Sequence, residues 1–500
     1  GDNYPYRLSL TAAPHVEFAF PPAGQPGDAG IFTLYGYNLP DSKPDKKTLA
    51  GNRLVESQEV KIRLPPDSLR THRFGQAHSA FVPYVSYRLR GNELLSNPLP
   101  LSTTTTPVLV AREDAGDRSQ EVVIPCEIHG RFDRTRDRDY FHFNAKKNQE
   151  LWVAVISERI GSSTDPSFRI ERVTTSDEGV QEFKQVAIAD DLGNDPGERY
   201  FPLPCRDAET AFKAPEEGLY RIILTNQTGS GGTDQLYRLL LREPRPSFDL
   251  IAIPWEQTRV ANRVDIAMPN ISPGGMVELR VVALRHEGFS GEIDLKVEGL
   301  PAGVTALPVK LGTGRSATLQ ILAAPDAPQW DGMIVIRGSG AGLTREARFG
   351  TTPWSIRDWS KQFFETRLGP RIPLSVTDSE NSLVSFRKPQ QDGFEITMGE
   401  HLEIPVQITR QSTATGDLTI RAEGLPDKTG ELKLSGSSEQ GIIVISSGRE
   451  NEFPRGPGEW TFRLRAEGKA RYQPSKATAD HARAQHQALV VRKRAHADTL

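Results

Sequence analysis

The side chains best suited to chemistry in this sequence are carboxylates in its second quarter. Asp137 and Asp139 stand two residues apart, just before an apolar strand pattern. Side chains two apart on a strand point the same way, so both could face one site. Calcium takes about six to eight oxygen ligands, and glycosidases use two carboxyl groups. The acidic residues considered for such chemistry are Glu113, Asp114, Asp137, Asp139, Asp190 and Asp191.

Two interpretations of this acidic group stay open. The first is a calcium site, the one cofactor that the sequence suggests, with the predicted ligands Glu113, Asp114, Asp137 and Asp139. The second is a salt-bridged turn, because Arg136 and Arg138 interleave with the two aspartates and could neutralise them. The turn is the simpler interpretation.

The sequence lacks the patterns that catalytic centres usually need. A zinc hydrolase of the HExxH type needs two histidines four apart, whereas His481 and His486 are five apart. The G-x-S-x-G pattern of a serine nucleophile is absent as well. We therefore predict no catalytic residue and no enzyme activity.

Two cysteines, Cys126 and Cys205, fall within one predicted domain. They could form a disulfide, or they could be two separate buried thiols, since cysteine is often a small core residue. Their spacing excludes a CxxC redox or zinc motif. Both alternatives remain open.

Composition favours a globular chain and excludes several partners. There are 61 Lys+Arg against 64 Asp+Glu, so bulk charge gives no nucleic-acid-binding surface. No apolar run approaches the ~18 residues that span a bilayer. Glycine and proline, at 43 and 37 residues, can punctuate many short strands.

The start of the chain repeats a segment found much later. Gly1 to Leu10 matches Gly232 to Leu241 with a constant offset of 231 (232 − 1), through residues that include Tyr6 with Tyr237 and Arg7 with Arg238. Both copies alternate in polarity like a half-buried strand and then meet a proline. We therefore predict that residues 1–20 are the final strand of a preceding domain in a longer array.

Residues 21–106 follow as the first complete unit. They open with a proline- and glycine-rich hinge and continue with alternating apolar positions, Phe32 and Leu34, before the G-x-N-L segment Gly36 to Leu39. This order resembles the TIG/IPT class of immunoglobulin-like domains. The resemblance implies a β-sandwich.

Residues 107–254 carry the densest set of motifs. They are Ile128 to Phe132, Asp137 to Phe141, the Asp190-Asp191 pair and Ala214 to Arg221. This order resembles the bacterial pre-peptidase C-terminal (PPC) domain. The resemblance implies a jelly-roll-like sandwich on an exported protein. It also implies that calcium could bind near the Asp137 turn, and some relatives bind collagen or other polymers.

The last two units repeat one another with a constant offset of 125 (403 − 278), as in Glu278 with Glu403 and Leu295 with Ile420. We predict two immunoglobulin-like sandwiches, residues 255–352 and 371–473, joined by a linker at 353–370. Residues 474–500 are rich in Ala, Arg, Lys and His and lack glycine, which predicts a helical tail or a linker.

Together these patterns predict an all-β fold, a string of immunoglobulin-like and jelly-roll-like sandwiches. The predicted function is a non-catalytic, exported bacterial protein with a structural, adhesive or polymer-binding role, secreted, periplasmic or on the cell surface. Its partners would be a protein or polysaccharide polymer or a second copy of itself. One alternative is the accessory region of a larger secreted hydrolase. Another is a self-assembling envelope or filament subunit that adds its N-terminal strand to a neighbour's sheet edge.

Overall fold

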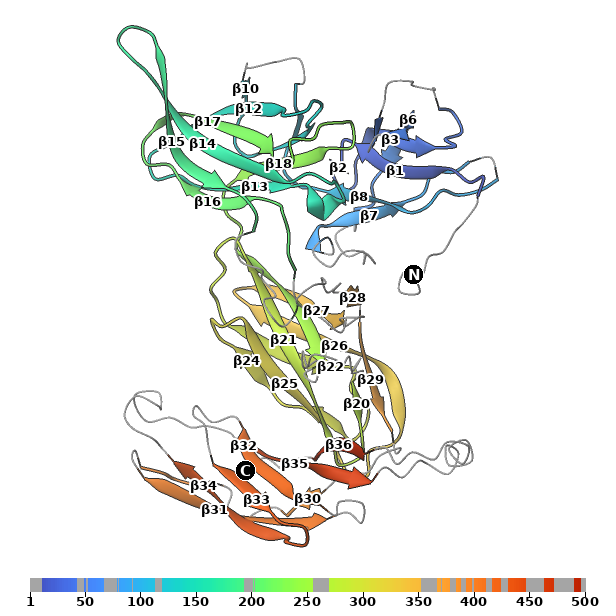
Figure 1. Cartoon of the computed structure of the whole chain (residues 1–500), viewed down its shortest axis with the longest axis vertical. Coiled ribbons are helices and arrows are strands. Elements are labelled where there is room, and N and C mark those ends of the chain that lie inside the picture. Colours follow the sequence, from blue (N-terminus) through green and yellow to red (C-terminus); the bar gives the residue numbers. More distant parts are fainter. Residues whose placement is uncertain are drawn as a thin grey trace. The chain divides into compact units, whose positions relative to one another are not determined.

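A computed structural model of the chain confirms the predicted fold class, a string of β-sandwich domains (Figure 1). Internal contacts divide it into two compact units. The first is Gly1–Asp249 with Leu284–Ser290 and Gly350–Pro370, and the second is Leu250–Ala283 with Gly291–Phe349 and Arg371–Leu500. The structure describes residues 11–42, 49–50, 53–66, 79, 81–91, 93–112, 119–192, 201, 203–254, 269–351, 367–369, 371–377, 384–387, 393–397, 400, 401–410, 416–423, 430–446, 463–471 and 490–495.

The first sandwich has two three-stranded sheets, in the orders β1-β3-β6 and β2-β8-β7. Its core lies between them and includes Phe32, Leu34 and Leu101, each at most 1% exposed. The strands are β1 (His15–Phe20), β2 (Ala23–Gly24), β3 (Ala29–Tyr37), β6 (Glu56–Arg63), β7 (Tyr84–Tyr87) and β8 (Leu99–Thr103), with a small hairpin of β4 (Leu49–Ala50) and β5 (Arg53–Leu54).

Strand β1 is tied into this sandwich on both of its edges. It pairs antiparallel with β3, and a Cβ on Gly36 of β3 would lie only 1.9 Å from the carbonyl oxygen of His15, so only glycine allows this approach. On the other edge, the Val16 N–H donates to Asn97 Oδ1 at 2.7 Å and Asn97 Nδ2 donates to the Val16 carbonyl at 2.8 Å. The asparagine thus blocks the strand edge at this point.

The second sandwich consists of two five-stranded sheets, in the orders β10-β12-β17-β14-β15 and β16-β13-β18-β11-β9. Aromatic residues fill the space between them, with Phe143 stacked on Tyr220 at 5.6 Å between ring centroids. The strands are β9 (Val108–Val110), β10 (Gln120–Glu121), β11 (Cys126–Arg131), β12 (Arg138–Ala145), β13 (Glu150–Ile156), β14 (Pro166–Thr175), β15 (Gln181–Ala189), β16 (Glu209–Lys213), β17 (Gly218–Asn226) and β18 (Leu236–Arg242).

The third sandwich joins eleven strands through one network, with β20-β29-β26-β27-β19-β21-β25-β23 as its main path. As its pattern predicts, β22 buries Ile293 and Leu295 and exposes Asp294. The strands are β19 (Ser247–Pro254), β20 (Asn270–Ile271), β21 (Met276–His286), β22 (Ile293–Glu298), β23 (Val304–Ala306), β24 (Val309–Leu311), β25 (Ser316–Ala323), β26 (Trp330–Gly340), β27 (Leu343–Thr351), β28 (Arg367–Gly369) and β29 (Ile372–Val376).

The fourth sandwich has sheets in the orders β30-β31-β34 and β33-β32-β35-β36. The offset of 125 found in the sequence places Glu278 of β21 with Glu403 of β31, and Leu295 of β22 with Ile420 of β32. The strands are β30 (Val384–Phe386), β31 (His401–Arg410), β32 (Leu418–Glu423), β33 (Glu431–Leu434), β34 (Gln440–Ser446), β35 (Arg463–Arg471) and β36 (Val490–Ala495).

Three strands belong to a different sandwich from the one that the sequence predicts for them. Because β1 pairs with β3, residues 15–20 belong to the first sandwich rather than to a preceding domain; residues 1–10 lie outside the described part. Likewise β19 pairs with β27 over Leu250–Ala252, so this strand belongs to the third sandwich. Strand β29 also pairs with β26 of the third sandwich. The proline break at Pro246 therefore separates β18 of the second sandwich from β19 of the third, and Pro14 directly precedes β1 of the first sandwich.

The predicted C-terminal helix is wrong where the structure describes it. Residues Val490–Ala495 form strand β36, which pairs antiparallel with β35. Pairing with the preceding strand of the chain has overridden the local helix propensity. The rest of the predicted tail lies outside the described residues. Within the part of the chain that is described, no helix is long and apolar enough to cross a membrane.

Candidate functional site

The predicted calcium ligands lie only partly in the described part of the chain. Glu113 and Asp114 fall outside it. Asp137 stands at the turn before β12, and its carboxylate accepts the backbone N–H groups of Arg134 at 3.3 Å and Arg138 at 3.0 Å. Backbone donors, rather than arginine side chains, therefore hold this carboxylate.

Asp139 faces a different partner. Its carboxylate accepts a hydrogen bond of 2.7 Å from the hydroxyl of Tyr237 on β18. Burial raises the pKa of Asp139 to about 7; the Tyr237 hydrogen bond opposes this shift, and the negative charges of Asp137 and Asp133 add to it. A cation would favour the charged carboxylate. Asp139 is therefore the residue on which the calcium prediction can best be tested.

A second acidic group comes together only in the fold. Carboxylate oxygens of Asp165, Asp190 and Asp191 lie within 4.8 Å of one another. The sequence analysis named the last two but missed Asp165, which precedes β14. Burial and the charge of Asp191 raise the pKa of Asp165, as the proximity of like charges requires.

Cys126 and Cys205 are both buried free thiols, and the structure contains no disulfide between them. Cys126 lies on β11 and joins the core between the two sheets. Burial raises the pKa of the Cys126 thiol to about 12, with a contribution from the charge of Glu127. Burial also raises the pKa of Cys205.

A buried polar cluster lies on the side of sheet β16-β13-β18-β11-β9 that faces away from its own core. Its members are Thr104, Glu127, His129 and Arg238, here called the joint cluster. Glu127 Oε1 accepts hydrogen bonds from Arg238 Nε at 2.6 Å and from His129 Nε2 at 2.8 Å. The Thr104 hydroxyl donates to Glu127 Oε2 at 2.5 Å. Glu127, His129 and Arg238 are at most 3% exposed.

The electrostatics of the joint cluster fix its protonation. Burial alone would raise the pKa of Glu127, but the Arg238 charge and the hydrogen bonds from His129 and Arg238 outweigh it and hold that pKa well below its usual range. Burial lowers the pKa of His129, against the opposing influence of Glu127. The cluster therefore consists of a carboxylate, a guanidinium and a neutral imidazole at neutral pH.

The joint cluster lies where the first sandwich meets the second within the first unit. Thr104 directly follows β8 of the first sandwich, and the guanidinium of Arg131 on β11 lies 5.0 Å from the ring centroid of Phe20 on β1. A sheet face that would otherwise be solvated is therefore covered by the neighbouring domain. Charged groups so placed need their partners, since a buried charge without one is costly.

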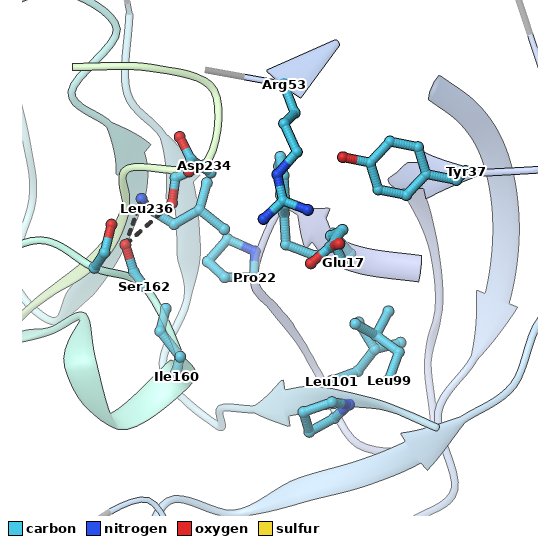
Figure 2. A pocket seen from close by; sticks show the side chains of 15 residues that line it. Glu17, Pro22, Tyr37, Arg53, Leu99, Leu101, Ile160, Ser162, Asp234 and Leu236 are labelled. Carbon is cyan, nitrogen blue, oxygen red and sulfur yellow. Dashed lines mark hydrogen bonds between the residues drawn. The ribbon is translucent and has the colours of Figure 1, made fainter. Parts of the chain in front are cut away.

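A hollow of about 300 Å³ lies at the same interface between the first and second sandwiches (Figure 2). The first sandwich contributes residues from β1, β3, β5 and β8, and the second contributes the turn after β13 and the start of β18. The lining is Glu17, Phe18, Ala19, Pro22, Tyr37, Arg53, Leu99, Pro100, Leu101, Ile160, Gly161, Ser162, Ser163, Asp234 and Leu236.

One buried carboxylate holds the turn that forms the far wall of the hollow. Asp207, which is 0% exposed, accepts the backbone N–H groups of Ser157 at 2.8 Å and Glu158 at 2.6 Å. It also accepts a hydrogen bond of 2.6 Å from Arg159 Nε. These contacts fix the short 3₁₀ turn Glu158–Ile160, so that Ile160 and the residues after it reach the hollow.

Comparison with known proteins finds only weak similarity to two solved structures. No family model matches the chain, and no curated protein matches it. Among solved structures, it is similar to the pre-peptidase C-terminal domain of collagenase from Bacillus anthracis, at 14% identity over 28% of this chain and 99% of that chain, with a TM-score of 0.18. It is also similar to a tetra-tandem repeat in the extending region of a large adhesion protein, at 8% identity over 94% of this chain and 96% of that chain, with a TM-score of 0.17. Likenesses this weak transfer no function.

Proposed function

We propose that this chain is a non-catalytic, exported bacterial string of β-sandwiches with a structural and polymer-binding role. The observation that carries the proposal is the joint cluster. Glu127 and Arg238 form an ion pair of 2.6 Å with side-chain exposures of 2% and 4%. Domains on independent flexible linkers do not require such a contact, whereas a spacer that must hold its domains in a fixed orientation does.

The energetics support a fixed joint. Desolvating two charges is expensive, and the pair offsets that cost only if its geometry is kept. Any rotation of the first sandwich that removes Thr104 would leave Glu127 Oε2 without its 2.5 Å donor. The two sandwiches of the first unit therefore work as one body. The export and the bacterial source rest on the resemblance of residues 107–254 to PPC domains.

A distance measurement between the two sandwiches tests the structural part. Spin labels on Lys61→Cys in β6 and Lys184→Cys in β15, both exposed positions, would be attached while the buried native thiols stay unlabelled. We expect one narrow distance distribution by pulsed electron resonance in the full chain, and a broader one after Glu127→Ala. A broad distribution in the unmodified joint would overturn the fixed orientation.

Sedimentation with insoluble polymers tests the binding part. The full chain would be mixed with collagen fibres, cellulose, chitin and peptidoglycan, and both retention and release of soluble fragments would be measured. We expect retention on at least one polymer and no fragment release from any. Release of soluble products that scales with protein concentration would contradict a non-catalytic role.

A further inference from the structure

Three polar side chains line the hollow between the first two sandwiches without an internal hydrogen-bond or ion-pair partner among the described residues. Arg53, Tyr37 and Asp234 come from β5, β3 and the segment before β18, and Figure 2 shows their polar groups around one space. Among the described residues, the Arg53 guanidinium, the Tyr37 hydroxyl and the Asp234 carboxylate make no hydrogen bond or ion pair. They are therefore free to bind a ligand.

The rest of the lining provides a further hydrogen-bond acceptor and a set of apolar side chains, here called the floor of the hollow. Glu17 adds a second carboxylate, which is shared with His15 at 3.5 Å. The apolar side chains come from both sandwiches and are Phe18, Ala19, Pro22, Leu99, Pro100, Leu101, Ile160 and Leu236. Ser162 is already engaged, because its hydroxyl donates to the Asp234 carbonyl at 3.1 Å and accepts the Leu236 N–H at 3.0 Å.

We propose that this hollow binds a short stretch of a carbohydrate chain, one or two sugar units long. The proposal deepens the polymer-binding role proposed above and rests on it. A sugar hydroxyl both donates and accepts, so it can bridge an arginine donor and a carboxylate acceptor at once. The carbon–hydrogen face of a sugar ring is apolar and suits the floor of leucine, proline and isoleucine.

The lining is less suited to other small ligands. A metal ion would meet the Arg53 charge, and an anion would meet Glu17 and Asp234. A volume of about 300 Å³ is at the lower end of ligand pockets, which matches a ligand of this size held between two domains. A peptide could use the same donors and acceptors, but its repeated amide groups would meet mostly apolar residues on the floor, and buried amides need partners.

Titration calorimetry on the full chain tests the proposal. The probes are maltotriose, cellotriose, chitotriose and mannotriose, with triglycine as the peptide probe. We expect at least one trisaccharide to bind, and Arg53→Ala and Asp234→Asn each to weaken it about tenfold or more, as expected for a hydrogen bond to a charged group. Tyr37→Phe should weaken it less, since it removes only a neutral hydroxyl.

Matched controls separate the hollow from the rest of the surface. Arg90→Ala and Asp41→Asn change exposed residues of the first sandwich that do not line the hollow, and they should leave the affinity unchanged. Circular dichroism would show that each variant keeps its fold.

Four outcomes would overturn the proposal. They also show whether the polymer-binding role fails together with it or stands without it. If no trisaccharide binds while an insoluble polymer still retains the chain, the hollow is not the binding site but the polymer-binding role stands. Trisaccharide binding that survives Arg53→Ala and Asp234→Asn would place the carbohydrate site elsewhere. Triglycine binding that these variants abolish would make the occupant a peptide. Failure to bind any trisaccharide or any polymer would remove this proposal together with the polymer-binding part of the proposed function, and would leave its structural part to the distance measurement.

Discussion

Arg238 Nε lies 2.6 Å from Glu127 Oε1, on strands β18 and β11, in a place where neither side chain reaches solvent. His129 stands directly opposite Arg238 in the register of the two strands and binds the same carboxylate oxygen. One carboxylate thus accepts hydrogen bonds from two buried side chains of its own sandwich and also from the hydroxyl of Thr104, which belongs to the first sandwich. The cohesion of the first unit therefore depends on Glu127 more than on any other member of the joint cluster.

Replacement of Glu127 by alanine should destabilise the first unit by about 3–5 kcal/mol, because it leaves the Arg238 charge buried without its partner. Calorimetric unfolding of the full chain would show the shift, and hydrogen exchange of peptides from β11 and β18 would locate it. The control is Glu182→Ala, which removes an exposed carboxylate of β15 and should cost at most about 0.5 kcal/mol. Equal effects of the two substitutions would refute the role of the joint cluster.

Acidification should weaken the same joint. The pKa of His129 is lowered in the folded state, so the unfolded state binds more protons as the pH falls below the unfolded value of about 6.5. The pKa of Glu127 is also lowered, so its contribution is present above its unfolded pKa and is lost as the pH falls further. Both shifts have the same sign, so the contribution of the joint cluster to stability should decrease from neutral pH downward, while the raised pKa of Asp139 acts in the opposite direction between about pH 7 and 4.

The variant His129→Gln keeps a side-chain donor but cannot titrate, so it should flatten the upper part of this pH dependence. Denaturant midpoints of the full chain, followed by hydrogen exchange in β11 across the acid range, would measure the slope. His15→Gln, at a side chain that is 48% exposed, is the control and should keep the slope of the unmodified protein. A slope in His129→Gln that equals that of the control would count against a neutral buried His129.

The sandwiches could be predicted from the sequence because their strands follow a local rule. Alternation in Ile293 to Val297 and the offset of 125 both arise from side chains that face a core every second residue, and the structure has these strands. The tail shows the limit of that rule. Its composition favours a helix, yet Val490–Ala495 pairs with β35, the strand that precedes it in the chain, and this pairing overrides the local propensity.

The joint cluster and the hollow could not be predicted in the same way. Glu127 and His129 alternate with the core residues Cys126 and Ile128, which is the pattern of a face open to water. No pattern in the sequence of β11 indicates that another sandwich covers this face. The one signal in the sequence is that Arg7 matches Arg238, so the repeated segment keeps the arginine as well as the apolar positions.

The two thiols give a direct test of the disulfide alternative. Since both cysteines are buried and free and the pKa of Cys126 is raised to about 12, neither should react with Ellman's reagent in the folded chain. Two thiols per chain should react after unfolding without reductant. Zero reactive thiols in the unfolded, unreduced protein would instead show that Cys126 and Cys205 are bridged.

Calcium should stabilise the second sandwich if the prediction from Glu113, Asp114, Asp137 and Asp139 is right. An ion bound only by the folded state adds about 2.7 kcal/mol at a hundredfold excess over its dissociation constant. The melting temperature of the full chain should therefore rise from chelator to added calcium. Asp139→Asn should abolish this rise, because it removes the charge that the ion would stabilise on that carboxyl group.

The second acidic group provides the matched control for that measurement. The double variant Asp190→Asn with Asp191→Asn removes two exposed carboxylates near Asp165 and should leave the calcium effect intact. If the double variant abolishes the effect and Asp139→Asn does not, the ion binds at Asp165 instead, where three carboxylates lie within 4.8 Å. An unchanged melting temperature in chelator and in calcium would exclude a structural ion at both places, and the Asp137 turn would then be held by its backbone donors alone.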